Sequence, residues 1–139
     1  MRRTFAAAAL LFGLSSGLAN AQSAPLFVTL GPADAALYKP DSGPAPHVGI
    51  VVIHRTADYM RHPACTQLSQ RGFMMLCFED IALDVKAAVA FLRKQPEITK
   101  VLLFGHSGGG PTVSFYQAVA ENGISYCTNA KRLVSIRTC

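Results

Sequence analysis

VLLFGHSGGGP, residues 101–111, joins four apolar residues to a Gly-x-Ser-x-Gly turn, and an amphipathic stretch follows. This order predicts a buried strand, a sharp turn and a helix. A serine in such a turn, here Ser107, is held clear of the sheet edge as a nucleophile. We expect Gly105 and Gly109 to let the strand and helix backbones approach without a Cβ clash. We also expect the backbone of Ser107 to occupy a strained, sparsely populated conformation.

The N-terminal segment has the pattern of a secretory signal peptide. Two arginines give it a basic start, residues 5–14 form an apolar run, and residues 19–21, Ala-Asn-Ala, form a small-x-small cleavage site. The pattern predicts a signal peptide over residues 1–21 and a cut before Gln22. The apolar run is too short for a membrane-spanning helix, and no later segment reaches spanning length. We therefore expect an exported protein, periplasmic or extracellular.

Residues 22–139 are expected to form one partial domain with an ordinary surface charge. The full chain has 13 basic and 8 acidic residues. Removal of Arg2 and Arg3 with the signal peptide leaves 11 basic residues against 8 acidic ones, a net charge of about +3. The basic residues are dispersed, and the densest cluster is Lys131-Arg132. Nucleic acid is therefore not an expected partner, and neither is an anionic membrane surface.

The rest of the chain alternates between strand and helix patterns. Residues 48–53 and 73–78 are continuous apolar runs, typical of strands buried on both faces of a parallel sheet. Weaker strands are expected at 26–30 and 35–39, and helices at 63–70, at 81–92 and from the serine turn to Asn122-Gly123. This alternation predicts an α/β fold, a mostly parallel sheet with flanking helices.

Residues 48–123 resemble the α/β-hydrolase superfamily. Four features occur in that family's order: a buried strand ending in His54, a helix-to-strand passage at 68–80, a helix at 84–92 and the turn at 105–109. They cover roughly two-thirds of the chain after the signal peptide. The resemblance implies the N-terminal half of an α/β-hydrolase fold. It also implies a serine hydrolase that acts on carboxylic esters or related acyl bonds, with a small ester or acyl substrate and no cofactor.

Acyl transfer at such a turn needs hydrogen-bond donors for a developing oxyanion. With Ser107 as the nucleophile, the backbone N–H of Gly108 is one expected donor, because it points from a helix N-terminus. A second donor is expected from the loop after the early strand, through the backbone N–H of Arg55 or of Thr56. Many family members carry glycine where this chain has Arg55, so we expect this side chain to narrow the oxyanion region.

The base and the acid that would activate the serine are missing from this sequence. In the family both follow the serine, whereas the residues after Ser107 contain no histidine, no aspartate and one glutamate, Glu121. The resemblance therefore implies a truncated or frameshifted enzyme. We expect the side chain of His106 to point away from the attacking oxygen, and His54 to fix its loop by hydrogen bonding. Asp80 is interpreted as a helix cap, with the orientation of a histidine as the alternative.

Four cysteines belong to the exported part of the chain: Cys65, Cys77, Cys127 and Cys139. An oxidising compartment favours their pairing, and proximity favours Cys65 with Cys77 and Cys127 with Cys139 among three connectivities. A buried free thiol at Cys77 is an equal alternative, because that residue lies in an apolar run. No cysteine has the close Cys or His neighbours of a zinc site, so no metal is expected.

A non-catalytic function is the second hypothesis. Half of an open sheet leaves one strand edge unpaired and apolar helix faces exposed. Such a half-domain is a gene remnant, or it persists through association with a partner or with a second copy at the incomplete sheet edge. This hypothesis predicts poor solubility or the formation of oligomers.

Overall fold

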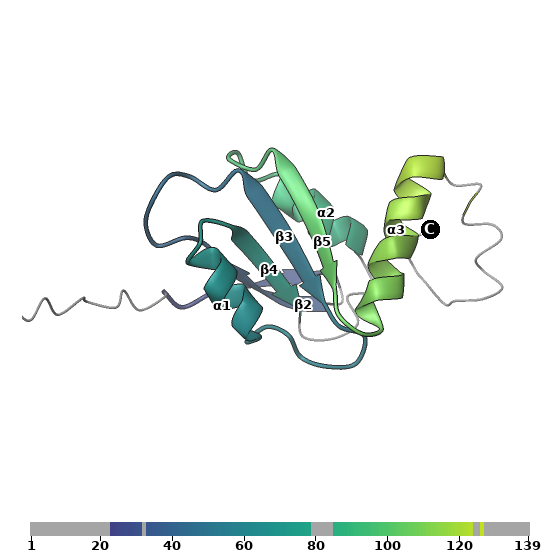
Figure 1. Ribbon diagram of the computed structural model, residues 1–139, viewed down its shortest axis with the longest axis horizontal. Helices are drawn as coiled ribbons and strands as arrows, with labels where there is room; N and C mark the ends of the chain where they lie inside the picture. Colours follow the sequence, from purple (N-terminus) through teal and green to yellow (C-terminus); the bar gives the residue numbers. More distant parts are fainter. Residues whose placement is uncertain (1–22, 32, 79–84, 124–125, 127–139) are drawn as a thin grey trace, which may run out of the picture.

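The computed structural model describes residues 23–31, 33–78, 85–123 and 126. The expected signal peptide, Asp80, Cys127 and Cys139 lie outside this part of the chain. Figure 1 shows the elements that the described residues form. In chain order they are β1 (Leu26–Leu30), β2 (Ala33–Tyr38), β3 (Val48–Ile53), α1 (Pro63–Ser69), β4 (Met74–Phe78), α2 (Val85–Arg93), β5 (Lys100–Gly105) and α3 (Gly109–Asn122). Strands and helices alternate from β3 onward, as the sequence predicts.

The strands form a mixed sheet in the order β1-β2-β4-β3-β5. β3 runs parallel to β4 and to β5, because α1 and α2 supply the crossover connections. β1 pairs antiparallel with β2, and β2 pairs antiparallel with β4. The α/β class is confirmed, but the prediction of a mostly parallel sheet is only partly right. The connections from β1 to β2 and from β2 to β3 contain no described helix, so each reverses the strand direction.

The sheet separates two apolar layers, with α1 on one face and α2 and α3 on the other (Figure 1). Helix α2 places its apolar side chains on the sheet and leaves Lys86 and Arg93 exposed, as the helical spacing predicts. Its buried residues are Val85, Ala88, Val89 and Leu92. Among the described residues, no helix has the length and apolar character needed to cross a membrane.

A disulfide joins Cys65 of α1 to Cys77 of β4. Both residues are fully buried in the layer between α1 and the sheet. The pairing that sequence proximity favours is confirmed for these two cysteines, and the free-thiol alternative for Cys77 is wrong. α1 has only seven residues, too few for a helix to be stable by itself, so the covalent link to β4 holds it on the sheet.

β5 lies at an edge of the sheet and differs from the buried strand that its apolar run predicts. β3 and β4 are buried along nearly their whole length, whereas β5 alternates between exposed and half-buried residues. Leu102 is 52 % exposed and Phe104 is 43 % exposed. They share the face of the sheet on which α1 packs, but α1 lies over β4 and β2 and does not cover β5. An apolar run alone does not distinguish a central strand from an edge strand.

Candidate active site

The loops after β3 and β5 begin side by side at one end of the sheet. Ile53, the last residue of β3, is paired with Gly105, the last residue of β5. The next residue, His106, donates its backbone N–H to the carbonyl of Ile53 at 3.0 Å. The parallel register therefore brings the serine turn against the loop that follows β3. The carboxyl ends of parallel strands are the usual place for a binding site in an open α/β sheet.

The turn at Ser107 has the strained backbone that the sequence predicts. Ser107 has φ +51°, and within the described part of the chain it is the only non-glycine residue with a positive φ. A Cβ on Gly105 would lie within 3.0 Å of backbone atoms of Gly109 and Gly110, closer than real Cβ atoms come. A Cβ on Gly109 would collide in the same way with the carbonyl oxygen of Ile53. The two flanking glycines therefore permit the close approach of β3, β5 and α3.

The side chain of Ser107 is exposed, and its hydroxyl makes no hydrogen bond to another described residue. Directly after it the chain enters α3. The carbonyl of His106 accepts the N–H of Gly109 at 2.8 Å, and the carbonyl of Ser107 accepts the N–H of Gly110 at 3.0 Å. The serine thus lies at the positive end of the dipole of α3, where the field favours a developing negative charge.

Two backbone amides beside the serine, those of Gly108 and Arg55, donate no hydrogen bond to another described residue. The stem of Arg55 packs over Gly108: a Cβ on that glycine would lie 2.5 Å from Cβ and 2.7 Å from Cδ of the arginine. The stem of Arg55 therefore occupies the space that a side chain on residue 108 would need. The N–H of Thr56, the other expected donor, is already engaged, because it donates to Nδ1 of His54 at 3.1 Å.

Imidazole side chains fix the loops around the turn. The hydrogen bond from Thr56 to His54 confirms the loop-fixing role expected of that histidine. Nδ1 of His62 accepts the N–H of Ala64 at 3.2 Å and so caps the N-terminus of α1. No imidazole forms a hydrogen bond with the hydroxyl of Ser107 among the described residues. Those residues also contain no group of three His, Cys, Asp or Glu arranged to hold a metal ion.

Tyr59 is a residue of this site that sequence reasoning misses. Its ring stacks on His54 with centroids 4.9 Å apart and on His62 with centroids 4.4 Å apart. Its phenolic oxygen lies 2.6 Å from Nδ1 of His106, the residue before the serine. The only signal in the sequence is the spacing His-x4-Tyr-x2-His directly after an apolar strand. That spacing places aromatic rings in one loop but does not indicate which of them meet.

The segment between β3 and α1 is anchored to the sheet around this tyrosine. The N–H of Tyr59 donates to the carbonyl of Phe78, the last residue of β4, at 2.8 Å. The hydroxyl of Tyr38 in β2 donates to the carbonyl of Met60 at 2.6 Å. Burial raises the pKa of Tyr38, which keeps this phenol protonated and a hydrogen-bond donor. The loop beside the serine turn is therefore held by β2 and β4 as well as by β3.

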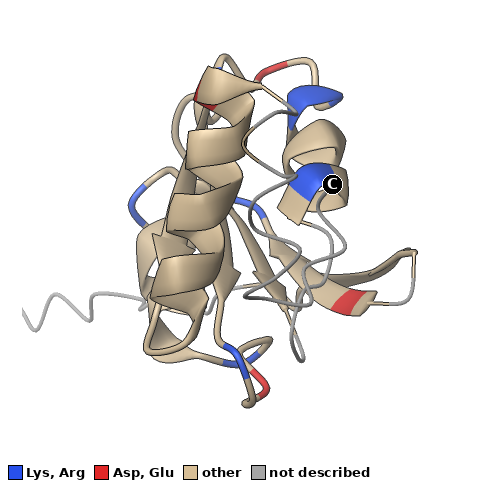
Figure 2. Ribbon diagram, turned by 90° about the vertical axis from the view of Figure 1, so that its right-hand side faces the viewer, with Lys and Arg blue, Asp and Glu red and all other residues tan. Residues whose placement is uncertain are grey.

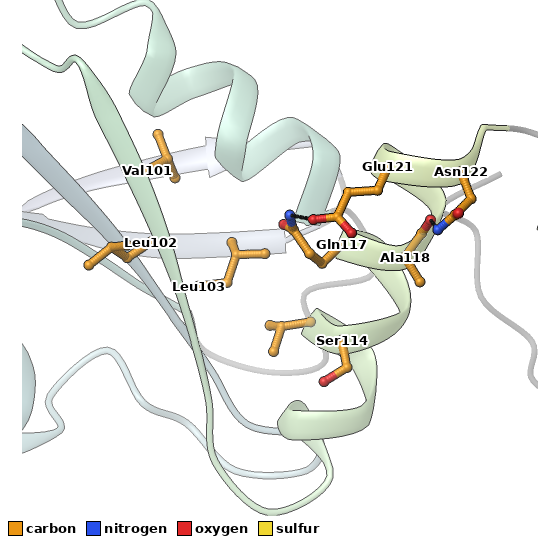
Figure 3. Close-up of a pocket in the computed structure, with 9 residues that line it drawn as sticks. Val101, Leu102, Leu103, Ser114, Gln117, Ala118, Glu121 and Asn122 are labelled. Carbon is orange, nitrogen blue, oxygen red and sulfur yellow. Dashed lines mark hydrogen bonds between the residues drawn. The ribbon is translucent and has the colours of Figure 1, made fainter.

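An open groove of about 580 Å³ runs along β5 and α3, away from the serine turn (Figure 3). A hydrogen bond from Gln117 to Glu121, 2.6 Å long, crosses part of its wall. The full lining is Val101, Leu102, Leu103, Val113, Ser114, Gln117, Ala118, Glu121 and Asn122. Because the lining includes neither Ser107 nor Gly108, this groove is separate from the serine turn.

Comparison with known proteins gives no family assignment for this chain. No protein-family model matches it, and neither does a curated protein. The resemblance to the α/β-hydrolases is therefore carried by the residues of this chain alone, above all by those of the serine turn.

Proposed function

We propose that the chain carries the nucleophile half of an α/β-hydrolase-like serine hydrolase acting on carboxylic esters or related acyl bonds. The supporting observation is the conformation of Ser107: φ is +51° at the junction of β5 and α3, between glycines with no room for a Cβ. A turn that only joins a strand to a helix places glycine at a positive φ without steric cost. A serine held there with an exposed hydroxyl is typical of a nucleophile.

In the proposed reaction the oxygen of Ser107 attacks the carbonyl carbon of the substrate, and the carbonyl π electrons move onto the carbonyl oxygen. The unengaged N–H groups of Gly108 and Arg55 are the proposed donors to this oxyanion. Each such donor contributes about 3 kcal/mol of transition-state stabilisation. Because the N–H of Thr56 is already bonded to an imidazole, we favour Arg55 over Thr56 as the second donor.

The proton of the serine hydroxyl needs an acceptor as the new bond forms. All four histidines precede Ser107 in the sequence, whereas in the family that this chain resembles the base and the acid follow the serine. We therefore propose that full activity depends on a base and an acid from outside the described residues. The oxyanion donors and substrate binding alone give a rate on the order of 10³-fold above that in water.

Ser107→Ala tests the proposed nucleophile. Because the oxyanion donors act without the missing base, we expect a fluorophosphonate probe to label the purified chain at Ser107 slowly, and labelling to fall at least about tenfold, to background, in the variant. Ser114→Ala is the matched control, because Ser114 is an exposed serine farther along α3 and should leave labelling unchanged. Peptide mapping by mass spectrometry identifies the labelled residue. The proposal is contradicted if the wild-type chain takes up no probe, or if Ser107→Ala reacts as fast as wild type.

A half-domain that works through association is the second candidate function, and the edge of the sheet favours it. Among the described strands none pairs with the outer edge of β5, and Leu102 and Phe104 are exposed on it. The groove between β5 and α3 lies open beside this edge (Figure 3). α3 carries one charged residue, Glu121, and the ribbon of this helix is almost entirely in the colour of uncharged residues in Figure 2. An uncharged helix face beside an unpaired strand edge is typical of a contact surface.

Leu102→Lys tests association through this edge. We expect the wild-type chain to sediment as an oligomer and Leu102→Lys to sediment as a monomer, because a charge on an edge strand opposes edge-to-edge pairing. Leu26→Lys is the matched control, since Leu26 is 62 % exposed on β1 at the opposite edge and should leave the oligomer intact. Sedimentation velocity gives the result. A monomeric wild-type chain that unfolds cooperatively would count against this second function.

Export from the cytosol is also proposed, to the periplasm or beyond. The buried disulfide between Cys65 and Cys77 supports it, because structural disulfides persist in oxidising compartments. After expression with an intact N-terminus, the expected mass is that of residues 22–139. A chain that stays in the cytosol and keeps residues 1–21 would refute this location.

A further inference from the structure

The ring of Tyr59 stacks on two imidazoles. The planes of His54 and His62 lie at 13° and 5° to it, so both are stacked on it. The ring of Tyr59 therefore has two imidazole neighbours that lie nearly parallel to it. The backbone of Tyr59 is held as well, by its N–H bond to the carbonyl of Phe78. These contacts restrict the phenol to one orientation.

In that orientation the hydroxyl of Tyr59 lies 2.6 Å from Nδ1 of His106. The Nδ1 atoms of the two stacking imidazoles already accept backbone N–H groups. A phenol can donate to an unprotonated Nδ1 and accept from a protonated one. The hydroxyl of Tyr59 and Nδ1 of His106 can therefore form this bond in either tautomer of the imidazole.

His106 is consequently fixed at its backbone and at its side chain. Its N–H donates to the carbonyl of Ile53 at 3.0 Å, and Tyr59 holds its ring. The next peptide bond is planar, so ψ of His106 places the Cα of the serine, and φ of Ser107 then places its Cβ and carbonyl group. That carbonyl is held on the other side by the N–H of Gly110, at 3.0 Å. A non-glycine residue keeps a positive φ only where its surroundings enforce it.

We propose that Tyr59 is a positioning residue for Ser107. Its hydrogen bond to His106 holds the serine in the positive-φ conformation and prevents the turn from relaxing. The same bond ties the loop that contains Arg55 to the turn that contains Gly108, the two proposed sources of oxyanion donors. The catalytic consequence rests on the proposed function, whereas the effect on the conformation of Ser107 does not.

Tyr59→Phe tests this role, because it keeps the stacked ring and removes only the hydroxyl. Tyr38→Phe is the matched control: it removes a hydroxyl bonded at the same 2.6 Å to Met60 and does not touch His106. The bond from the N–H of Tyr59 to the carbonyl of Phe78 still anchors the loop in this variant. We expect Tyr59→Phe to lower the second-order rate constant for fluorophosphonate labelling of Ser107 about tenfold, equivalent to one net hydrogen bond. Tyr38→Phe should stay within about twofold of wild type, and in a His106→Ala background Tyr59→Phe should add no further loss.

A second measurement needs no reaction. The three-bond HN–Hα coupling of Ser107 reports its φ, and we expect it to change in Tyr59→Phe and not in Tyr38→Phe. An unchanged coupling in Tyr59→Phe, or an equal loss of labelling in the two phenylalanine variants, would overturn the positioning role. A wild-type chain that resists labelling contradicts the proposed function instead, and the coupling of Ser107 then still decides the role of Tyr59.

Discussion

Gly105→Ala is expected to lower the free energy of unfolding by about 3 kcal/mol, the upper range for an overpacked site. A Cβ at this position would lie within 3.0 Å of the carbonyl group of Gly109 and the nitrogen of Gly110. These are backbone atoms, so no side-chain rotation relieves the clash, and either β5 or α3 has to move. Such a shift also distorts the turn between them, and we expect the labelling of Ser107 to fall together with the stability.

Gly110→Ala provides the matched control, at a glycine in the first turn of α3. Among the described residues outside α3 and the adjacent chain, the one atom within 4 Å of a Cβ at this position is the carbonyl oxygen of Gly105, at 3.7 Å, which is an ordinary contact. Alanine also favours a helix over glycine by about 1 kcal/mol, so this variant should be as stable as wild type or more stable. Urea unfolding followed by far-UV circular dichroism measures both variants. Equal stability of the two alanine variants would show that β5 and α3 do not meet as closely as the glycines indicate.

The serine turn could be predicted from sequence because its determinants are local. Gly105, Ser107 and Gly109 lie within five residues, and the steric reason for each is a contact between adjacent elements. The strands β3 and β4 could also be predicted from sequence, because a short run of apolar or β-branched residues is typical of a strand buried on both faces. Helical spacing likewise predicts which face of α2 is buried against the sheet.

Strand direction and edge position could not be predicted, because they depend on contacts between distant segments. The run at β5 is as apolar as those at β3 and β4, yet its exposure is set by what lies on either side of it. β1 and β2 pair antiparallel because the connections that follow them contain no described helix. The pattern of residues within a strand carries no information on the direction of that strand.

The candidate site also contains residues that local sequence predicts and residues that depend on contacts between distant segments. Ser107 and Gly108 follow from the turn, but the choice between Arg55 and Thr56 depends on which amide the fold leaves unengaged. The ring of His54 decides it by accepting the N–H of Thr56. The role of Tyr59 could not be predicted for the same reason, because its ring contacts depend on the path of the loop, which β2 and β4 hold.

Removal of the disulfide in Cys65→Ala/Cys77→Ala is expected to lower the free energy of unfolding by about 3 kcal/mol, the usual loss for a loop of this length. Both sulfurs are fully buried, so the variant also loses packing between α1 and β4. The effect should reach the serine turn. His62 caps α1 and stacks on Tyr59. If the helix loosens from the sheet, Tyr59 therefore also loses its stacking contact with His62.

Measurements with and without a reducing agent distinguish the contribution of this disulfide to stability from that of the other two cysteines. Wild type under reducing conditions should unfold near the urea midpoint of the double alanine variant, because both then lack the bond between Cys65 and Cys77. Any further loss in the variant on reduction measures the contribution of Cys127 and Cys139, whose pairing the sequence favours. A double variant as stable as oxidised wild type would mean that α1 stays on the sheet through packing alone. In that case the labelling rate of Ser107 should also match wild type, because the stack on Tyr59 would be undisturbed.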